Sequence, residues 1–422
     1  MSFASGSISS EKAPSLGLPF RYFAISLIFL ALFGLLLPFN GNLFLGGFRV
    51  PGLLMMVHIL TLGWITTTIL GAAFQLVPVA LQVSLFSERL ANALLPLFLG
   101  GVVTMIVALW RFQTTWMVTG ASLLLLAATG YLYLMVRTMF RVRHWDVIAA
   151  HVAASVGMAF LIPTLGLLMA LQNTSGLLGA AYLPTLRTHL LLAALGYVSL
   201  LIIGVSYKLI AMFTLTEDLF PERLAWAEFG LVLAGLTGLT GAFYFPSWRW
   251  LGWAGGLALL AGVGIYARIL IGLYRHRRRR LFDINTPFTQ ASLAWFLITL
   301  LMAGVALGGL FPVTQSWWIA VAWSLLLGWV GQMIIGQMYK ITPFLTWLHR
   351  YADLVGVEQV PGLDDLYNRN LALVGFGFWN GGVLLGAAAI LGSWGGLMTV
   401  AGAILAVGIA LFILNMIFVA TR

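Results

Sequence analysis

The chain has 422 residues, of which 61% are hydrophobic and only 8% charged, and its formal net charge is +10. A mean hydropathy of +1.01 and this shortage of charge, against about a quarter in soluble domains, exclude a soluble globular fold. The positive charge is spread between apolar segments, so it does not indicate nucleic-acid binding. Cysteine is absent, which excludes disulfides, thiolate metal sites and Cys-ligated iron–sulfur clusters.

Residues 1–19 open the chain and are rich in Ser, Gly and Pro. They contain neither a basic stretch followed by an apolar run nor a small-residue cleavage site, so they do not match a signal peptide. We expect them to form a disordered cytoplasmic tail.

Twelve apolar segments follow, each long enough to cross a bilayer as a helix. They are predicted near 21–39, 53–80, 92–110, 117–137, 147–171, 185–213, 225–244, 250–272, 290–311, 317–346, 371–391 and 396–420. Each is apolar all round, which favours lipid-facing helices over the alternating strands of a membrane barrel. We therefore expect an all-α polytopic protein of the lipid bilayer.

Arginines are unevenly divided between the two ends of these segments. If the segments alternate in direction, one side carries only Arg49, Arg111, Arg187 and Arg249. The other side carries Arg21, Arg89, Arg137, Arg141, Arg143, Arg223, Arg275, the run at 277–280, Arg350, Arg369 and Arg422. Because the richer side is cytoplasmic by the positive-inside rule, we expect a multi-pass protein of the plasma membrane with both termini in the cytoplasm.

One short phrase recurs three times, at a spacing of about 133 residues. It comprises Gly63-Trp64 with Gly71, Phe74 and Gln75, then Gly196-Tyr197 with Gly204, Tyr207 and Lys208, then Gly328-Trp329 with Gly336, Tyr339 and Lys340. The first two copies are followed by Phe86-Ser87-Glu88-Arg89-Leu90-Ala91 and by Phe220-Pro221-Glu222-Arg223-Leu224-Ala225. The repeat predicts three four-helix units, at 20–145, 146–282 and 283–422, related by a pseudo-threefold axis along the membrane normal. The repeated glycines favour close helix packing.

Three of the six histidines lie in predicted helices, where an ionisable side chain is costly and therefore a functional candidate. His58 and His189 lie near the outer ends of the second and sixth helices. His151 begins the fifth helix near the cytoplasmic face, where we expect it to be wet or locally hydrogen-bonded, and it is a weaker candidate. Neutral imidazole is a ligand for haem iron and for copper.

His58 stands five residues before its repeated glycine and His189 stands seven before its own. At about 100° per residue, the two side chains face different neighbours and could converge on one space between the second and sixth helices. The alternative is that each only hydrogen-bonds a carbonyl or hydroxyl across a helix interface.

No Asp or Glu is predicted deep in any of the helices. Lys208 and Lys340 lie near the cytoplasmic ends of their helices and can extend to the interface. The sequence thus argues against proton pumping driven by oxygen reduction. The same absence makes a transporter function less favoured, because transporters usually hold charge at the membrane midplane.

A twelve-helix chain in three four-helix arcs, with histidines near the outer ends of the second and sixth helices, resembles the catalytic subunit of the haem–copper oxidase superfamily. Its cbb3-type oxidase and nitric oxide reductase branches are the most similar. The resemblance implies that His58 is an axial ligand of a b-type haem and that His189 corresponds to a copper ligand.

Other metal ligands of that family are missing. Val321 and Trp323 stand where the tenth helix has a His-x-His pair, and Ala193 stands where the sixth helix has a tyrosine. The seventh helix, at 224–244, lacks the His-His pair that binds copper. What the resemblance implies is therefore a haem b whose iron is held by His58, with His189 or an open position opposite, and no copper. His151 is a remote further candidate for the iron.

Two hypotheses of function follow. The first is a haem b membrane protein in electron transfer, or in binding or reduction of nitric oxide or oxygen, as an oxidoreductase related to nitric oxide reductases and terminal oxidases. A quinol or a periplasmic protein would be its electron donor. The second is a transporter, or a structural subunit of a respiratory complex, with no cofactor of its own. Further subunits or a homo-oligomer are compatible with both.

Overall fold

The computed structural model describes residues 14–278, 283–307 and 313–422, and over these ranges the chain forms helices and no strands. Twelve helical segments of the described ranges are long and apolar enough to cross a membrane, and each coincides with one of the predicted segments. The prediction of an all-α polytopic membrane protein is confirmed. Residues 1–13 of the predicted tail, Arg279 and Arg280 of the basic run, and the end of the predicted segment 290–311 lie outside the described residues.

The last residues of the predicted tail belong to the folded part. Helix α1 (Gly17–Asn40) begins two residues before the predicted end of the tail. Just before it, the backbone N–H of Ser15 donates a hydrogen bond of 3.0 Å to the carboxylate of Glu88. This carboxylate, at the start of the third span, fixes the entry into α1.

Two compact units make up the chain. The first comprises residues 1–23, 67–108 and 112–279, and the second comprises residues 24–66, 109–111 and 280–422. The boundary passes through α1 and through the second membrane span rather than through a linker.

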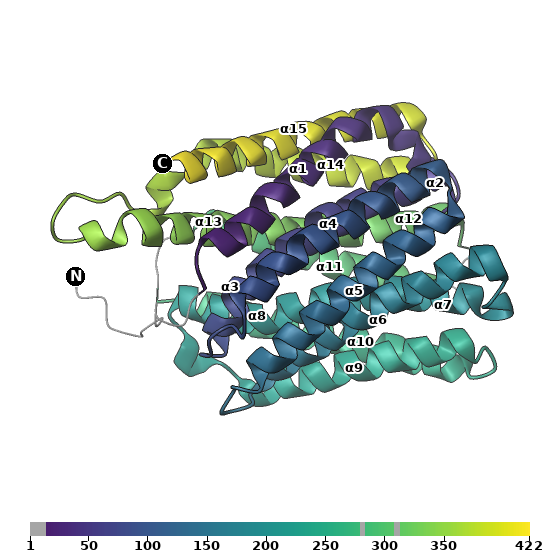
Figure 1. Ribbon diagram of the computed structural model, residues 1–422, viewed down its shortest axis with the longest axis horizontal. Coiled ribbons are helices and arrows are strands. Elements are labelled where there is room, and N and C mark those ends of the chain that lie inside the picture. The colour runs from purple at the N-terminus through teal and green to yellow at the C-terminus, as the bar shows by residue number, and fades with distance from the viewer. Residues whose placement is uncertain (1–13, 279–282, 308–312) are drawn as a thin grey trace. The chain divides into compact units, whose positions relative to one another are not determined.

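The first unit is built around six long spans. Its elements are most of α4 (Glu88–Arg111), then α3 (Thr67–Ala80), α5 (Thr114–Met139), α6 (Val147–Ser175), η4 (Gly179–Ala181), α7 (Tyr182–Leu191), η5 (Leu192–Ser199), α8 (Leu200–Thr214), η6 (Glu217–Leu219), α9 (Glu222–Tyr244) and α10 (Arg249–Arg275). Helix α5 packs along α6 and α9 packs along α10 (Figure 1), while α8 contacts both α6 and α10. Asp146 caps α6, because its carboxylate accepts a hydrogen bond of 2.8 Å from the backbone N–H of Ala149.

The second unit holds the C-terminal third of the chain. Its elements are η2 (Gly41–Leu45), α2 (Pro51–His58), η3 (Ile59–Thr66), α11 (Asn285–Leu307), α12 (Gln315–Trp323), η7 (Ser324–Gly331), α13 (Gln332–Arg350), η8 (Ala352–Leu354), η9 (Leu363–Leu366), α14 (Arg369–Gly392) and α15 (Gly395–Thr421). Helices α14 and α15 form an antiparallel pair (Figure 1). The buried amide of Asn415 on α15 donates to Tyr339 Oη at 3.2 Å and to the Asn368 carbonyl at 2.9 Å. It ties α15 to α13 and to the start of α14.

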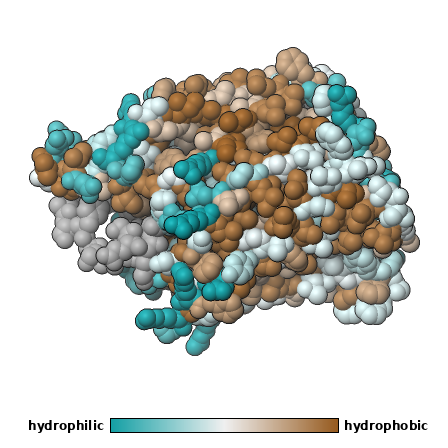
Figure 2. Space-filling model, viewed as in Figure 1, coloured by the Kyte–Doolittle hydropathy of each residue, from teal (hydrophilic) through white to brown (hydrophobic). Residues whose placement is uncertain are grey.

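Large apolar side chains cover the outside of the helices. Ile28, Leu35 and Phe39 on α1 are 67%, 70% and 87% exposed, and Leu126 and Leu257 on α5 and α10 are 57% and 64% exposed. Figure 2 shows hydrophobic residues over most of the surface in view. Soluble monomers rarely expose such continuous apolar area, so these side chains face lipid.

Three membrane spans contain a π-helical segment at the same place in the repeated phrase. The segments are η3, η5 and η7, each of eight residues. Each begins four residues before the first glycine of the phrase, at Gly63, Gly196 or Gly328. A π-helix bonds each N–H to the carbonyl five residues back, and such segments are rare and frequent at functional sites. The recurrence follows the spacing of the sequence repeat, although the boundaries of the four-helix units remain a prediction.

The repeated glycines lie against the helix that opens each predicted repeat. A Cβ on the second glycine of the phrase would lie no more than 2.7 Å from a side-chain Cβ of that helix, for Gly71 against Tyr22, Gly204 against His151, and Gly336 against Phe288. Real Cβ atoms do not approach so closely. The glycines thus allow the helices to touch, as expected, and the contacts make Tyr22, His151 and Phe288 equivalent positions.

Gly204→Ala should therefore lower the free energy of unfolding by about 1–3 kcal/mol, because the methyl group would overlap His151 on the facing helix. Unfolding in detergent by titration with SDS measures the effect. Gly157→Ala on α6 is the matched control, since nothing lies within 4 Å of the added Cβ and loss of glycine from a helix is favourable. Equal stability of the two variants would contradict the packing role.

Candidate functional site

His58 is the last residue of α2 and immediately precedes the π-helical segment η3. Its ring is part-buried, and its Nδ1 lies 2.7 Å from the Leu54 carbonyl one turn earlier in the same helix. A carbonyl can only accept, so Nδ1 carries the proton and Nε2 presents its lone pair. A histidine held this way has the tautomer and fixed orientation typical of metal-ligating histidines.

His189 lies on α7, three residues before the π-helical segment η5. Its Nδ1 is 3.1 Å from the carbonyl of Ile162 on α6, so it bonds across a helix interface as the alternative prediction had it. Because a neutral imidazole carries only one N–H, Nε2 is then the acceptor nitrogen. Because His58 belongs to the second unit and His189 to the first, their convergence on one space remains a prediction.

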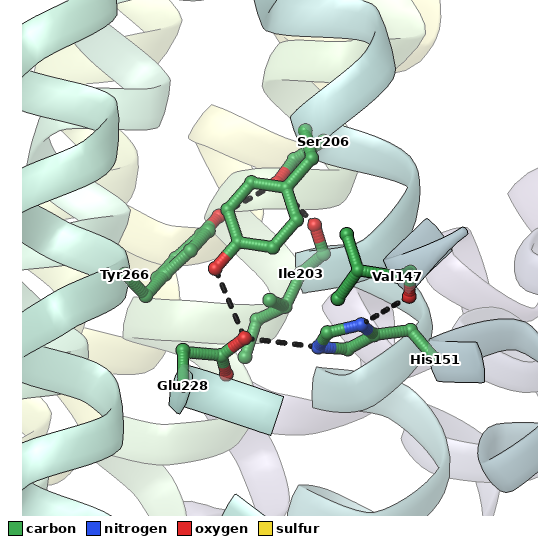
Figure 3. Close-up of polar contacts among 7 residues, drawn as sticks. Val147, His151, Ile203, Ser206, Glu228 and Tyr266 are labelled. Carbon is green, nitrogen blue, oxygen red and sulfur yellow. Dashed lines mark hydrogen bonds and ion pairs between the residues drawn. The ribbon is translucent and has the colours of Figure 1, made fainter. Parts of the chain in front are cut away.

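His151 is locally hydrogen-bonded, which is one of the two environments expected for it. Its side chain is fully buried rather than wet, and its Nδ1 lies 2.8 Å from the Val147 carbonyl. Its Nε2 lies 3.0 Å from Oε2 of Glu228 on α9. Figure 3 shows the ring held between Val147 and Glu228. With both nitrogens taken up by protein atoms, His151 offers no lone pair to haem iron.

Glu228 is the group that sequence reasoning missed. Its side chain is completely buried within the protein, at 0% exposure, although it lies near the start of α9 and not deep in the helix. Tyr207 of α8 donates a hydrogen bond of 2.9 Å to Oε2, the atom that also faces His151. Glu228 escaped notice because it follows the charged start of α9 by less than two turns. The signal was in the repeat, since Leu94 stands six residues after Glu88, the glutamate of the first Glu-Arg-Leu-Ala, just as Glu228 stands six after Glu222 of the second.

The two lysines of the repeated phrase differ in surroundings. Lys208 pairs with Glu217 at 2.7 Å near the helix end, and the side chains are 35% and 52% exposed. Lys340 pairs with Asp283, and there the side chains are only 8% and 10% exposed. The expected extension to the interface thus fits Lys208, whereas Lys340 is neutralised inside the protein.

Among the residues that the structure describes, no three His, Cys, Asp or Glu side chains gather as metal ligands. His58 and His189 each fit as a ligand of a haem iron, because each is part-buried in a membrane span and has its Nδ1 held by a carbonyl.

No known protein-family model matches this sequence, and no curated protein matches it closely enough to count as a relative.

Proposed function

We propose that the protein binds one haem b through His58 and works in electron transfer, or in binding or reducing nitric oxide or oxygen. The observation that supports it is the Nδ1 bond of His58 to the Leu54 carbonyl, which orients Nε2 beside a π-helical segment. The haem would supply one-electron chemistry or a gas-binding iron. The protein's part is to hold the imidazole and to surround the group with apolar side chains.

The role of His189 decides between the two forms of this function. If His189 as well as His58 held the iron, the haem would serve electron transfer. If His58 alone held it, the iron could also bind a small gas. The Nδ1 bond of His189 to Ile162 fixes the ring in either case.

We further propose that the protein lies in the plasma membrane with both termini in the cytoplasm. The excess of arginine on one side of the spans supports this orientation. It places His58 and His189 in the outer leaflet, where a quinol or a periplasmic protein can deliver electrons.

Optical spectra of the purified protein, oxidised and dithionite-reduced, test the haem together with a pyridine haemochrome assay. The wild type should contain about one haem b per chain, and His58→Ala should lose it. His276→Ala is the matched control, because His276 makes the same bond to a carbonyl one turn earlier but is exposed at a helix end. A colourless wild-type protein would refute the proposal.

Carbon monoxide then separates the two forms. If His189 is a ligand, the reduced wild type should not bind carbon monoxide, whereas His189→Ala should bind it. Binding by the wild type would instead assign the open-site form.

A transporter without a cofactor is the second candidate. The observation in its favour is Glu228, since an intramembrane carboxylate marks ion or proton pathways in membrane proteins. Haem in the purified protein would decide against it.

A further inference from the structure

His151, Glu228 and Tyr207 are in contact inside the protein, and we call them the His–Glu–Tyr site. Their hydrogen bonds determine how many protons these side chains share. Nδ1 of His151 donates to the Val147 carbonyl, and the Tyr207 hydroxyl donates to Oε2 of Glu228. Nε2 and Oε2 then face each other at 3.0 Å. Two lone pairs would repel at that distance, so one proton lies between them, on either the imidazole or the carboxyl group.

One atom of the site is left without a partner. Oε1 of Glu228 is buried and accepts no hydrogen bond from the described residues. Buried polar atoms are nearly always satisfied, so an exception calls for a chemical explanation. Loss of the shared proton would leave Nε2 and Oε2 in repulsion and a bare negative charge in the bundle. A second proton, by contrast, finds an open lone pair on Oε1.

The fold itself does not require this pair. At the position equivalent to His151 the other two copies hold Tyr22 and Phe288, which pack against the same glycine of the phrase. In the first copy Tyr22 bonds the Ala91 carbonyl at 2.8 Å, and Leu94 stands at the place of Glu228. Buried ion pairs are seldom more stabilising than apolar residues of similar size. The pair is therefore an addition to the repeat that packing alone does not explain.

The site lies close to the ends of the helices that carry it. At about 1.5 Å per residue, His151 lies roughly 6 Å and Glu228 roughly 9 Å along α6 and α9 from their first residues. The next residue after Tyr207 is Lys208, whose ion pair with Glu217 is half exposed. Apart from its three members, the titratable and charged groups on α6, α8, α9 and α10 are Asp146, Lys208, Glu222, Arg223, Tyr244, Arg249, Tyr266, Arg268, Tyr274 and Arg275. Those on α5, α7 and η5, which also pack against α6 or α9, are Tyr131, Tyr133, Arg137, Tyr182, Arg187, His189 and Tyr197. Of all these, Tyr131, Tyr197 and Tyr266 are buried, and Tyr266 bonds Ser206 at 3.0 Å (Figure 3).

We propose that the His–Glu–Tyr site binds and releases a proton, which it exchanges with the aqueous phase at the end where α6 and α9 begin. Before uptake the shared proton lies on Nε2 of His151, so an imidazolium donates to Oε2 of the Glu228 carboxylate. On uptake a proton from water forms an O–H bond at Oε1 of Glu228, and the imidazolium keeps its own proton. On release the O–H bond breaks, its electron pair returns to the carboxylate, and the proton leaves to water. The proposal does not depend on the haem.

Infrared difference spectra between neutral and acidic pH, recorded on the purified protein in lipid, test it. We expect the wild type to gain a carboxylic acid C=O band in acid, and Glu228→Gln to lack that band. A pH-indicator dye should register one proton less per chain in the variant. Glu217→Gln is the matched control, because it makes the same change at a half-exposed carboxylate and should leave the Glu228 band in place.

His151→Tyr combined with Glu228→Leu is the second variant, which takes the residues of the first copy and so keeps the test valid if Glu228→Gln fails to fold. It should fold and also lack the band. Identical difference spectra for wild type and Glu228→Gln, or a Glu228 band that is present at every pH, would overturn the proposal and leave the pair a fixed structural contact.

Discussion

Replacement of Lys340 by methionine is expected to lower the free energy of unfolding by about 3–5 kcal/mol, because it breaks the buried ion pair between Lys340 and Asp283. Removing both charges together, with Lys340→Met and Asp283→Leu, should restore most of that loss, since apolar side chains of similar size can replace a buried ion pair. Unfolding by SDS in detergent micelles measures both variants.

Lys208→Met is the matched control for this experiment. Lys208 holds the same position in the repeated phrase, but its ion pair with Glu217 is half exposed. Exposed pairs contribute at most about 1 kcal/mol, so this variant should unfold close to the wild type. If Lys340→Met and Lys208→Met have the same effect, burial of the Lys340 pair is not what stabilises the second unit.

Trp379→Ala is the second change for which we expect a loss of about 3–5 kcal/mol in the free energy of unfolding, as for other buried aromatic residues. Trp379 is 1% exposed, and its ring centroid lies 5.9 Å from that of Trp64. Its Nε1 donates to the carbonyl of Leu327 in the π-helical segment η7 at 3.1 Å. The variant would therefore leave a cavity and remove a hydrogen bond at the point where the backbone departs from the α-helical ladder.

Two further variants separate these contributions in the same unfolding measurement. Trp379→Phe keeps most of the ring but not the donor, so it should lose less than Trp379→Ala. Trp253→Ala on α10 removes a tryptophan that is 50% exposed and should change stability little. A loss from Trp253→Ala as large as that from Trp379→Ala would show that the effect is not one of core packing.

The twelve spans could be predicted because a bilayer demands long apolar helices, and hydropathy alone reports them. The predicted bounds were short by a few residues at most ends, as at α7 and α13, because residues such as Tyr182 and His349 continue a helix beyond its apolar window. The start of α1 at Gly17 was missed for another reason, since it depends on the contact of Ser15 with Glu88, far away in the sequence.

The candidate site was only partly predictable. His58 and His189 stand out because histidine is rare in apolar segments, but their hydrogen bonds depend on neighbours that the sequence does not identify. Glu228 was overlooked because a hydropathy window treats the first turns of a helix as interface. Only the comparison between repeats, with Leu94 in one copy and Glu228 in the other, singles it out. The π-helical segments could not be predicted from the hydrophobic pattern of the sequence. That pattern indicates which side chains are apolar, whereas a π-helix is defined by which carbonyl each backbone N–H bonds.

The three π-helical segments also carry information about the history of the chain. A π turn holds one residue more than the α turn it replaces, so it amounts to a single-residue insertion that the helix has absorbed. An insertion at the same distance from the same glycine in three spans is most simply explained by one event in an ancestral four-helix gene, before it was copied twice. On that view His151 and Glu228 arose later, in the middle copy of the repeat alone.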